Sequence, residues 1–252
     1  MRLRPALAGL LLLATGPLAA REAGFLARTV IVDGAPHRYV VYVPATMARR
    51  PPVILALHGA GERGDDGWLP TDVGLGHAIR QHPERWPAIV VFPQAAADHS
   101  WLDDRRIALA ALVQAEQRFH ADRHRVYAVG LSMGGNGVWG LAHDNARRFA
   151  AAVVVAGFAG PFHSFAGIIP DGQPDPFTAL ARELAAAKLP VWIVHGDVDP
   201  VVPVADSRAM AAALTAAGGD VRYHELPGVG HNSWDPAFAD PALPAWLFTR
   251  RR

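Results

Sequence analysis

Hydrophobic residues along the chain predict alternating strands and helices. Short, almost purely apolar runs occur at Val53–Leu57, Ala88–Phe92, Val126–Val129, Ala151–Val155 and Val191–Val194. Such runs are typical of strands buried on both faces, as in a parallel sheet. The stretches between them are typical of helices and lie at 103–121, 134–143, 177–187 and 204–217. The alternation predicts one mostly parallel, doubly wound α/β domain over residues 21–252.

The two ends of this pattern differ from its middle. β-branched and aromatic residues at 28–33 and 37–43 are separated by Gly34-Ala-Pro36, which predicts an antiparallel hairpin at the start of the sheet. Residues 221–226 alternate between apolar and polar, as an edge strand does. The stretch 157–176 is rich in Gly, Pro and Phe, and its length suggests a binding loop or a partial lid.

The first twenty residues have the layout of a secretory signal peptide. Arg2 and Arg4 precede a short apolar stretch, and Ala19-Ala20 provide small residues before Arg21. The uncharged run from Pro5 to Ala20 is shorter than the roughly 20 residues that span a bilayer. We therefore expect a signal peptide over 1–20, a periplasmic or secreted enzyme, and no stable membrane insertion after cleavage.

Composition narrows the possible chemistry. The chain is 51% hydrophobic and 19% charged, as expected for a folded domain. Its 24 basic and 23 acidic residues give a net charge of +1, which offers no overall field for nucleic acid. The chain has no cysteine, so a thiolate nucleophile, a cysteine-bound metal and disulfides are all excluded.

A candidate nucleophile stands at the end of the third of these apolar runs. Gly130-Leu131-Ser132-Met133-Gly134 matches G-x-S-x-G and falls between a predicted strand and a predicted helix. This context is the one required for a nucleophile elbow, a strained turn that exposes the serine hydroxyl above the sheet. The flanking glycines would provide the room that such a turn needs.

A serine hydroxyl needs a base and a group that orients the base, and in this fold order both follow the serine. His195-Gly-Asp197-Val-Asp199 follows the last buried run and offers two acids. We favour Asp199, which lies further past the strand and is followed by proline, and we interpret Asp197 as a turn residue. His231 lies in the glycine-rich loop after residues 221–226 and is the candidate base.

A second glycine-rich loop, His58-Gly-Ala60-Gly-Glu-Arg-Gly64, follows the first buried run. It also matches G-x-G-x-x-G, but the next strand ends without the acid that a dinucleotide site requires. We interpret it as an oxyanion loop, in which the amide of Ala60 acts together with that of Met133. His58 is expected to brace this loop.

The remaining candidates are less specific. Trp101, Phe158 and Phe162 follow predicted strand ends, and each either lines a substrate pocket or packs in the core. His120 and His124 have the spacing of a metal pair but no third ligand nearby in the sequence, so we expect a solvated surface and no metal site.

Four stretches together resemble the α/β-hydrolase superfamily and, within it, bacterial phospholipase/carboxylesterases of the dienelactone-hydrolase-like type, also called predicted peptidases. They are 57–64, 130–135 with Trp139 nearby, 195–203 and 228–234. The resemblance implies an α/β-hydrolase fold, Ser132 as nucleophile with Asp199 and His231 as partners, and ester hydrolysis without a cofactor. Asn136 stands where we expect an aromatic residue in relatives.

The sequence thus predicts an exported serine hydrolase of the carboxylesterase type that forms an acyl-enzyme. Its expected substrates are small-molecule or polysaccharide-linked esters. Two alternatives remain open: a serine peptidase of the same fold, and a binding module without catalysis on a hydrolase scaffold.

Overall fold

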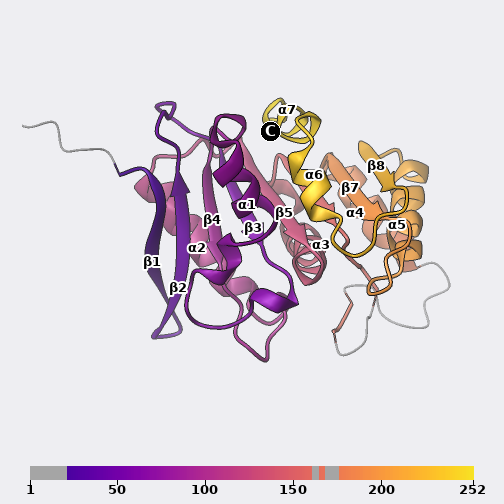
Figure 1. Cartoon of the computed structure of the whole chain (residues 1–252). Coiled ribbons are helices and arrows are strands. Elements are labelled where there is room, and N and C mark those ends of the chain that lie inside the picture. Colours follow the sequence, from indigo (N-terminus) through magenta and orange to yellow (C-terminus); the bar gives the residue numbers. More distant parts are fainter. Residues whose placement is uncertain (1–21, 161–164, 168–175) are drawn as a thin grey trace, which may run out of the picture.

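The structure is a computed structural model that describes residues 22–160, 165–167 and 176–252 (Figure 1). The expected signal peptide and Phe162 lie outside these residues. An eight-stranded sheet has the order β1-β2-β4-β3-β5-β6-β7-β8. Its strands are β1 (Gly24–Val32), β2 (Ala35–Val43), β3 (Val53–Leu57), β4 (Ile89–Pro93), β5 (Val126–Leu131), β6 (Ala151–Val155), β7 (Val191–Gly196) and β8 (Val221–Leu226).

The helices connect these strands. They are α1 (Gly74–Gln81), α2 (Arg105–Arg118), α3 (Met133–Asn145), α4 (Pro176–Ala186), α5 (Val204–Ala216), α6 (Trp234–Ala239) and α7 (Ala242–Phe248). Short 3-10 turns occur at η1 (Ala60–Glu62), η2 (Leu69–Thr71), η3 (Pro83–Arg85) and η4 (Ala146–Arg148). None of the described helices is long and apolar enough to cross a membrane.

The N-terminal hairpin is antiparallel, as predicted, but its turn lies earlier than expected. Asp33 and Gly34 both have positive φ, 52° and 80°, whereas Ala35 and Pro36 already belong to β2. Positive φ at both central residues is the mark of a tight type I′ turn, whose twist suits a two-residue hairpin. β2 then pairs antiparallel with β4, and the rest of the sheet is parallel.

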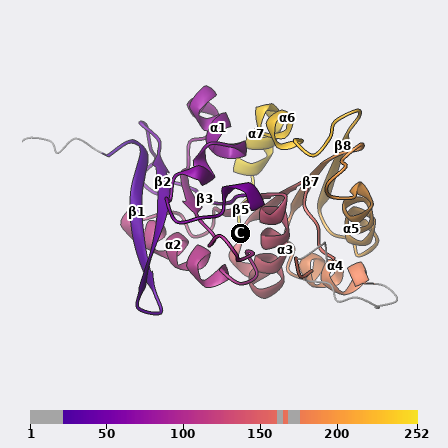
Figure 2. The same cartoon turned by 60° about the horizontal axis from the view of Figure 1, so that its bottom comes forward.

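Each buried strand contributes to two cores. In β3, Val53, Leu55 and Leu57 face a core formed with α2, α3, α4 and α5. Ile54 and Ala56 face a second core formed with α1, α6 and α7. Figure 2 shows α1, α6 and α7 on one side of the sheet and α2, α3 and α4 on the other. This double burial explains the continuous apolar runs.

The parallel strands run in one direction, so the loops that follow β3, β5, β6, β7 and β8 gather at one edge of the sheet. We call this the carboxyl edge, and the opposite one the amino edge. β8 is the edge strand, as its alternating pattern predicted. The carboxyl edge carries the candidate site.

Candidate active site

Ser132 stands between β5 and α3 in a strained backbone conformation. Its φ of 52° and ψ of −120° are rare for a residue with a side chain, and such strain is held only where the surroundings enforce it. Its amide donates to the carbonyl oxygen of Val155 at 2.8 Å, so β6 fixes the turn.

The glycines on either side of the turn are required by close backbone contacts. A Cβ on Gly130 would lie 2.2 Å from the carbonyl oxygen of Gly134, and one on Gly134 would lie 2.1 Å from that of Leu57. Both distances are far below van der Waals contact. The structure therefore gives a physical reason for both glycines of the G-x-S-x-G motif.

A continuous hydrogen-bonded chain joins Ser132 to the residues predicted as its partners. Nε2 of His231 lies 3.0 Å from Oγ of Ser132, and Nδ1 of His231 lies 2.8 Å from Oδ2 of Asp199. The three side chains come from the loops after β5, β7 and β8. Trp234 packs edge-on against the His231 ring, with centroids 5.2 Å apart, and so restrains the imidazole.

The carboxylate of Asp199 is fully enclosed and fully hydrogen-bonded. Its side chain has no exposed surface. Oδ1 accepts the amides of Val201 and Val202 at 2.8 and 2.9 Å, while Oδ2 accepts from His231. Burial opposes ionisation, but these donors outweigh it and lower the pKa of Asp199. The group is therefore an anion at neutral pH.

His195 is a further member of this network that the sequence analysis did not assign. Its Nε2 lies 3.1 Å from Oδ2 of Asp199 and 3.1 Å from the carbonyl oxygen of Val202. Because both are acceptors, we assign the proton to Nε2, which leaves Nδ1 to accept from Oγ of Ser207 at 2.7 Å. Burial lowers the pKa of His195, in keeping with a neutral ring. The sequence feature that could have identified His195 is its position at the carboxyl end of a predicted strand, β7.

Asp197, the other acid considered, does not face the histidine. Its Oδ1 accepts the amide of Gly228 at 2.7 Å, across the gap between the loops after β7 and β8. Asp197 therefore holds together the two loops that carry Asp199 and His231.

The oxyanion-loop residues also lie beside the serine. Met133 is the first residue of α3, whose leading amides have no partner within the helix. Ala60 begins η1, directly after Gly59, and a Cβ on Gly59 would lie 3.6 Å from Cβ of Ser132. The loop after β3 thus approaches the serine closely, as the expected role of Ala60 requires.

His58 joins this loop to the segment after β4. The amide of Ala95 donates to Nε2 of His58 at 3.0 Å, so we place the ring proton on Nδ1, which lies 2.6 Å from the carbonyl oxygen of Gly59. Burial lowers the pKa of His58 to about 4. Protonation of Nε2 would place its N–H against the amide N–H of Ala95.

Glu62 is an acid in the oxyanion loop whose role the sequence did not indicate. Its Oε2 is buried, without a hydrogen-bond partner among the described residues, and lies 3.2 Å from the position of a Cβ on Gly59. Burial raises the pKa of Glu62, although the amides of Gly59 and of Glu62 itself act in the opposite direction.

The structure does not place the described aromatic candidates on an accessible surface. Trp101 is 0% exposed, donates to the carbonyl oxygen of His58 at 2.9 Å and packs under the loop after β3. Phe158 is 2% exposed. Both positions correspond to the packing alternative. Asn136 is buried and donates to the carbonyl oxygen of Phe158 at 3.2 Å, which ties α3 to the loop after β6.

No metal site accompanies this arrangement in the part of the chain that the structure describes. There, no group of three or more His, Asp or Glu side chains is placed to hold a metal ion. His120 and His124 are both exposed.

The fold and the site geometry together define an α/β-hydrolase with a serine, histidine and aspartate in hydrogen-bonded sequence. The model of the dienelactone hydrolase family matches residues 97–241, more than half of the chain, and the protein belongs to this family.

Several known proteins with similar sequences or structures are esterases. A thermostable esterase superposes with a TM-score of 0.75 at 28% identity, covering 90% of this chain and 63% of that one. A ferulic acid esterase superposes with a TM-score of 0.68 at 17% identity, covering 89% and 96%, and at this identity shows the fold alone. Esterase LipQ of Mycobacterium tuberculosis is 51% identical over 43 residues, which are 17% of this chain and 10% of that protein.

Proposed function

We propose that the protein is a serine carboxylic-ester hydrolase that acts through an acyl-enzyme. The observation that carries this proposal is the chain of contacts from Oγ of Ser132 through both nitrogens of His231 to the buried Asp199. An arrangement of this kind converts a weakly nucleophilic hydroxyl into one whose proton has an acceptor in place.

In the first half of the reaction, Oγ of Ser132 attacks the ester carbonyl carbon while its proton passes to Nε2 of His231. The carbonyl oxygen becomes an oxyanion that the amides of Ala60 and Met133 stabilise. The C–O bond to the alcohol then breaks, and Nε2 returns the proton to the departing oxygen. The alcohol leaves, and the acyl group stays esterified to Ser132.

In the second half, water attacks the acyl carbon and gives one proton to Nε2 of His231. The bond to Oγ breaks, Ser132 recovers the proton, and the carboxylic acid leaves. Throughout, Asp199 fixes the imidazole tautomer with its proton on Nδ1 and stabilises the imidazolium. No step requires a cofactor or a metal.

The test is a comparison of wild type and Ser132→Ala on a panel of aryl esters and peptide amides. We expect kcat/KM for the esters to fall by about 10⁶-fold in the variant. An organophosphorus probe should label Ser132 in the wild type, as mapped by peptide mass spectrometry. Faster turnover of peptide amides would establish a peptidase instead, and absence of both turnover and labelling would establish a binding module.

The proposal includes export to the periplasm or the medium, supported by the charged, apolar and small-residue segments of residues 1–20. Cell fractionation with N-terminal sequencing tests it. A cytosolic protein that still begins at Met1 would contradict export.

A further inference from the structure

Basic side chains collect at the amino edge of the sheet, opposite Ser132. The segments that precede the parallel strands at this edge are rich in arginine, and several of these cations are exposed with no ion pair or side-chain hydrogen bond to the described residues. They are Arg49, Arg50, Arg123, Arg147 and Lys188. We call these residues the amino-edge cations.

The last described residues add further positive charge to the same edge. The amide of Arg252 donates to the carbonyl oxygen of His124 at 3.0 Å, and its guanidinium donates to those of Ala146 and Ala187, both at 3.0 Å. Arg251 pairs with Asp122 at 2.9 Å. The C-terminal arginines are thus fastened across the starts of β5, β6 and β7 and belong to the rigid surface.

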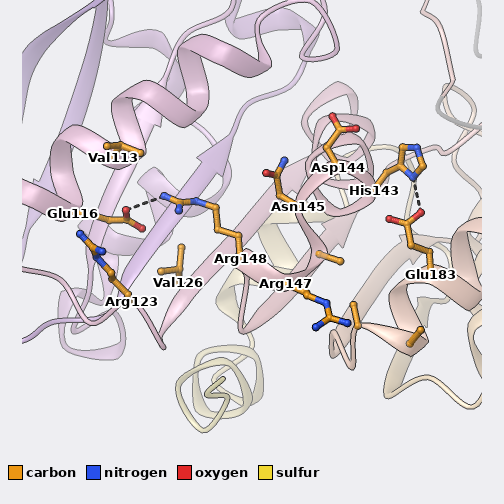
Figure 3. Close-up of a pocket in the computed structure, with 13 residues that line it drawn as sticks. Val113, Glu116, Arg123, Val126, His143, Asp144, Asn145, Arg147, Arg148 and Glu183 are labelled. Atoms are coloured by element: carbon orange, nitrogen blue, oxygen red, sulfur yellow. Dashed lines mark hydrogen bonds and ion pairs between the residues drawn. The ribbon is translucent and has the colours of Figure 1, made fainter.

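A cleft of about 870 Å³ opens at this edge, between the end of α2 and the ends of α3 and α4 (Figure 3). Two of the acids that line the cleft pair with arginines: Glu116 with Arg148, and Asp144 with Arg105. Glu183 bonds to His143, which offsets its charge only when the imidazole is protonated. Figure 3 shows the Arg148 guanidinium joined to Glu116, whereas Arg123 and Arg147 carry no such link. Among the described lining residues, the arginines without a partner are therefore Arg123 and Arg147.

The carboxyl edge has the opposite character. Asp65, Asp66, Asp98 and Asp103 are exposed there and have no ion pair to the described residues. Two exposed arginines also lie at this edge, Arg38 and Arg106, and Arg106 pairs with Asp33. β5 spans the two edges with six residues, or about 20 Å at roughly 3.3 Å per residue. This is more than twice the screening length of about 8 Å at physiological ionic strength, so the two edges present separate fields. The net charge of +1 conceals this separation.

We propose that the amino edge docks on the anionic surface of a phospholipid bilayer, with the carboxyl edge and Ser132 facing away from it. Arginines spread over one face of the protein can each bind a lipid phosphate in the bilayer surface. The acidic side chains of the carboxyl edge are repelled by the same phosphates. In contrast, single-stranded nucleic acid binds where exposed aromatic rings stack on bases. Within the described ranges the exposed aromatic side chain is Trp68, which lies at the carboxyl edge.

The experiment measures co-sedimentation of the full chain with vesicles. We would compare phosphatidylcholine vesicles with vesicles that also hold about 30 mol% phosphatidylglycerol, at about 0.15 M salt. The variant Arg49→Gln/Arg123→Gln/Arg147→Gln removes three amino-edge cations that make no ion pair or side-chain hydrogen bond with the described residues. The control variant, Arg38→Gln/Arg106→Gln/Arg182→Gln, removes the same charge from exposed positions outside the amino-edge cations. It also removes the ion pair of Arg106 with Asp33 and the bond of Arg38 to the carbonyl oxygen of Asp65.

We expect wild type and control to bind the anionic vesicles alone, and the amino-edge variant to lose about 100-fold in partitioning. Bound enzyme should still hydrolyse a soluble ester at the rate of free enzyme. Absence of wild-type binding, equal loss in the control, or inhibition on the vesicle would overturn the proposal. Tighter binding to duplex or single-stranded DNA than to vesicles would also overturn it, in favour of nucleic acid.

Discussion

His195 donates a hydrogen bond to the same carboxylate oxygen of Asp199 that accepts from His231. The donor is 0% exposed, neutral and held by Ser207, so it is a fixed part of the scaffold. A neutral donor supports the charge of Asp199 without repelling the imidazolium that forms on His231 during the reaction. His195 therefore acts through Asp199, as a positioning residue.

The first prediction concerns this bond. His195→Leu replaces the imidazole with a side chain of similar volume that has no N–H. Because a hydrogen bond to a charged group is lost, we expect kcat to fall about 10-fold and KM to change little. With one donor fewer, Asp199 becomes more basic, and the acid limb of the kcat/KM profile should move to higher pH. Steady-state kinetics over a pH series measures both effects.

His195→Gln is the matched control, since its amide N–H reaches toward the position of Nε2. It should restore most of the activity and return the acid limb to the wild-type pH. If His195→Leu lowered thermal stability but left the pH profile unmoved, His195 would have a packing role only.

The second prediction separates the two acids of the loop after β7. Asp199→Asn offers an amide to Nδ1 of His231 and favours the wrong imidazole tautomer, so kcat should fall by about 10⁴-fold. Asp197→Asn keeps an oxygen that can accept from the amide of Gly228, so kcat should change by no more than a few-fold. Comparable losses in the two variants, with both proteins folded by circular dichroism, would reverse the assignment of Asp199.

The third prediction concerns the pH dependence of stability, which His58 should govern between about pH 6.5 and 4. Its pKa falls from 6.5 to about 4 on folding, so the unfolded chain binds more protons in this window. Stability is complete above pH 6.5 and decreases as the pH falls. The full difference is about 3 kcal/mol, of which about 2 kcal/mol should be lost by pH 5. Urea unfolding at pH 7 and pH 5 measures it.

His58→Gln tests the source of this dependence. The glutamine oxygen can accept from the amide of Ala95 but does not titrate, so the difference between the two pH values should shrink. His195, whose pKa is also lowered by burial, accounts for part of what remains. An unchanged difference in His58→Gln would show that other groups cause the pH dependence.

The fold could be predicted from the sequence wherever the spacing of apolar residues follows from the burial of the strand that carries them. The apolar runs predicted the parallel strands correctly because each strand faces two cores, and the alternation of Val221–Leu226 correctly predicted an edge strand. α1, α6 and α7 were not predicted. They are short, and α6 and α7 contain Pro236 and Pro244, so their stability comes from packing on the second core.

The candidate site was predictable where one motif fixes both the chain geometry and the chemistry. Ser132, Asp199 and His231 each follow a strand, and the parallel topology brings strand ends together. Contacts between distant segments have no motif in the sequence, so they could not be predicted. The role of His195 is an example, because its partner Ser207 lies on α5. Trp101 shows the same limit, because neither its position after β4 nor its residue type distinguishes a pocket wall from a buried brace.

The fourth prediction concerns the contact between the two loops that carry Asp199 and His231. A Cβ on Gly196 would lie 2.1 Å from the carbonyl oxygen of Val229 and 2.4 Å from that of Gly230. Both neighbours are backbone atoms, so Gly196→Ala must push the loops apart. A displacement of about 1 Å at a catalytic group costs on the order of 100-fold in rate, and we expect a loss of kcat of at least that size.

Gly230→Ala is the matched control, because it adds the same methyl group next to His231. The nearest atom to its Cβ would be Cδ of Pro200 at 3.8 Å, an ordinary contact, and its φ is not in the left-handed region. Its activity should stay within a few-fold of wild type. The required glycine in this region is therefore Gly196 rather than Gly230. Loss of activity in Gly230→Ala with retention in Gly196→Ala would show that the loop containing His231 depends on its own flexibility and not on its approach to β7.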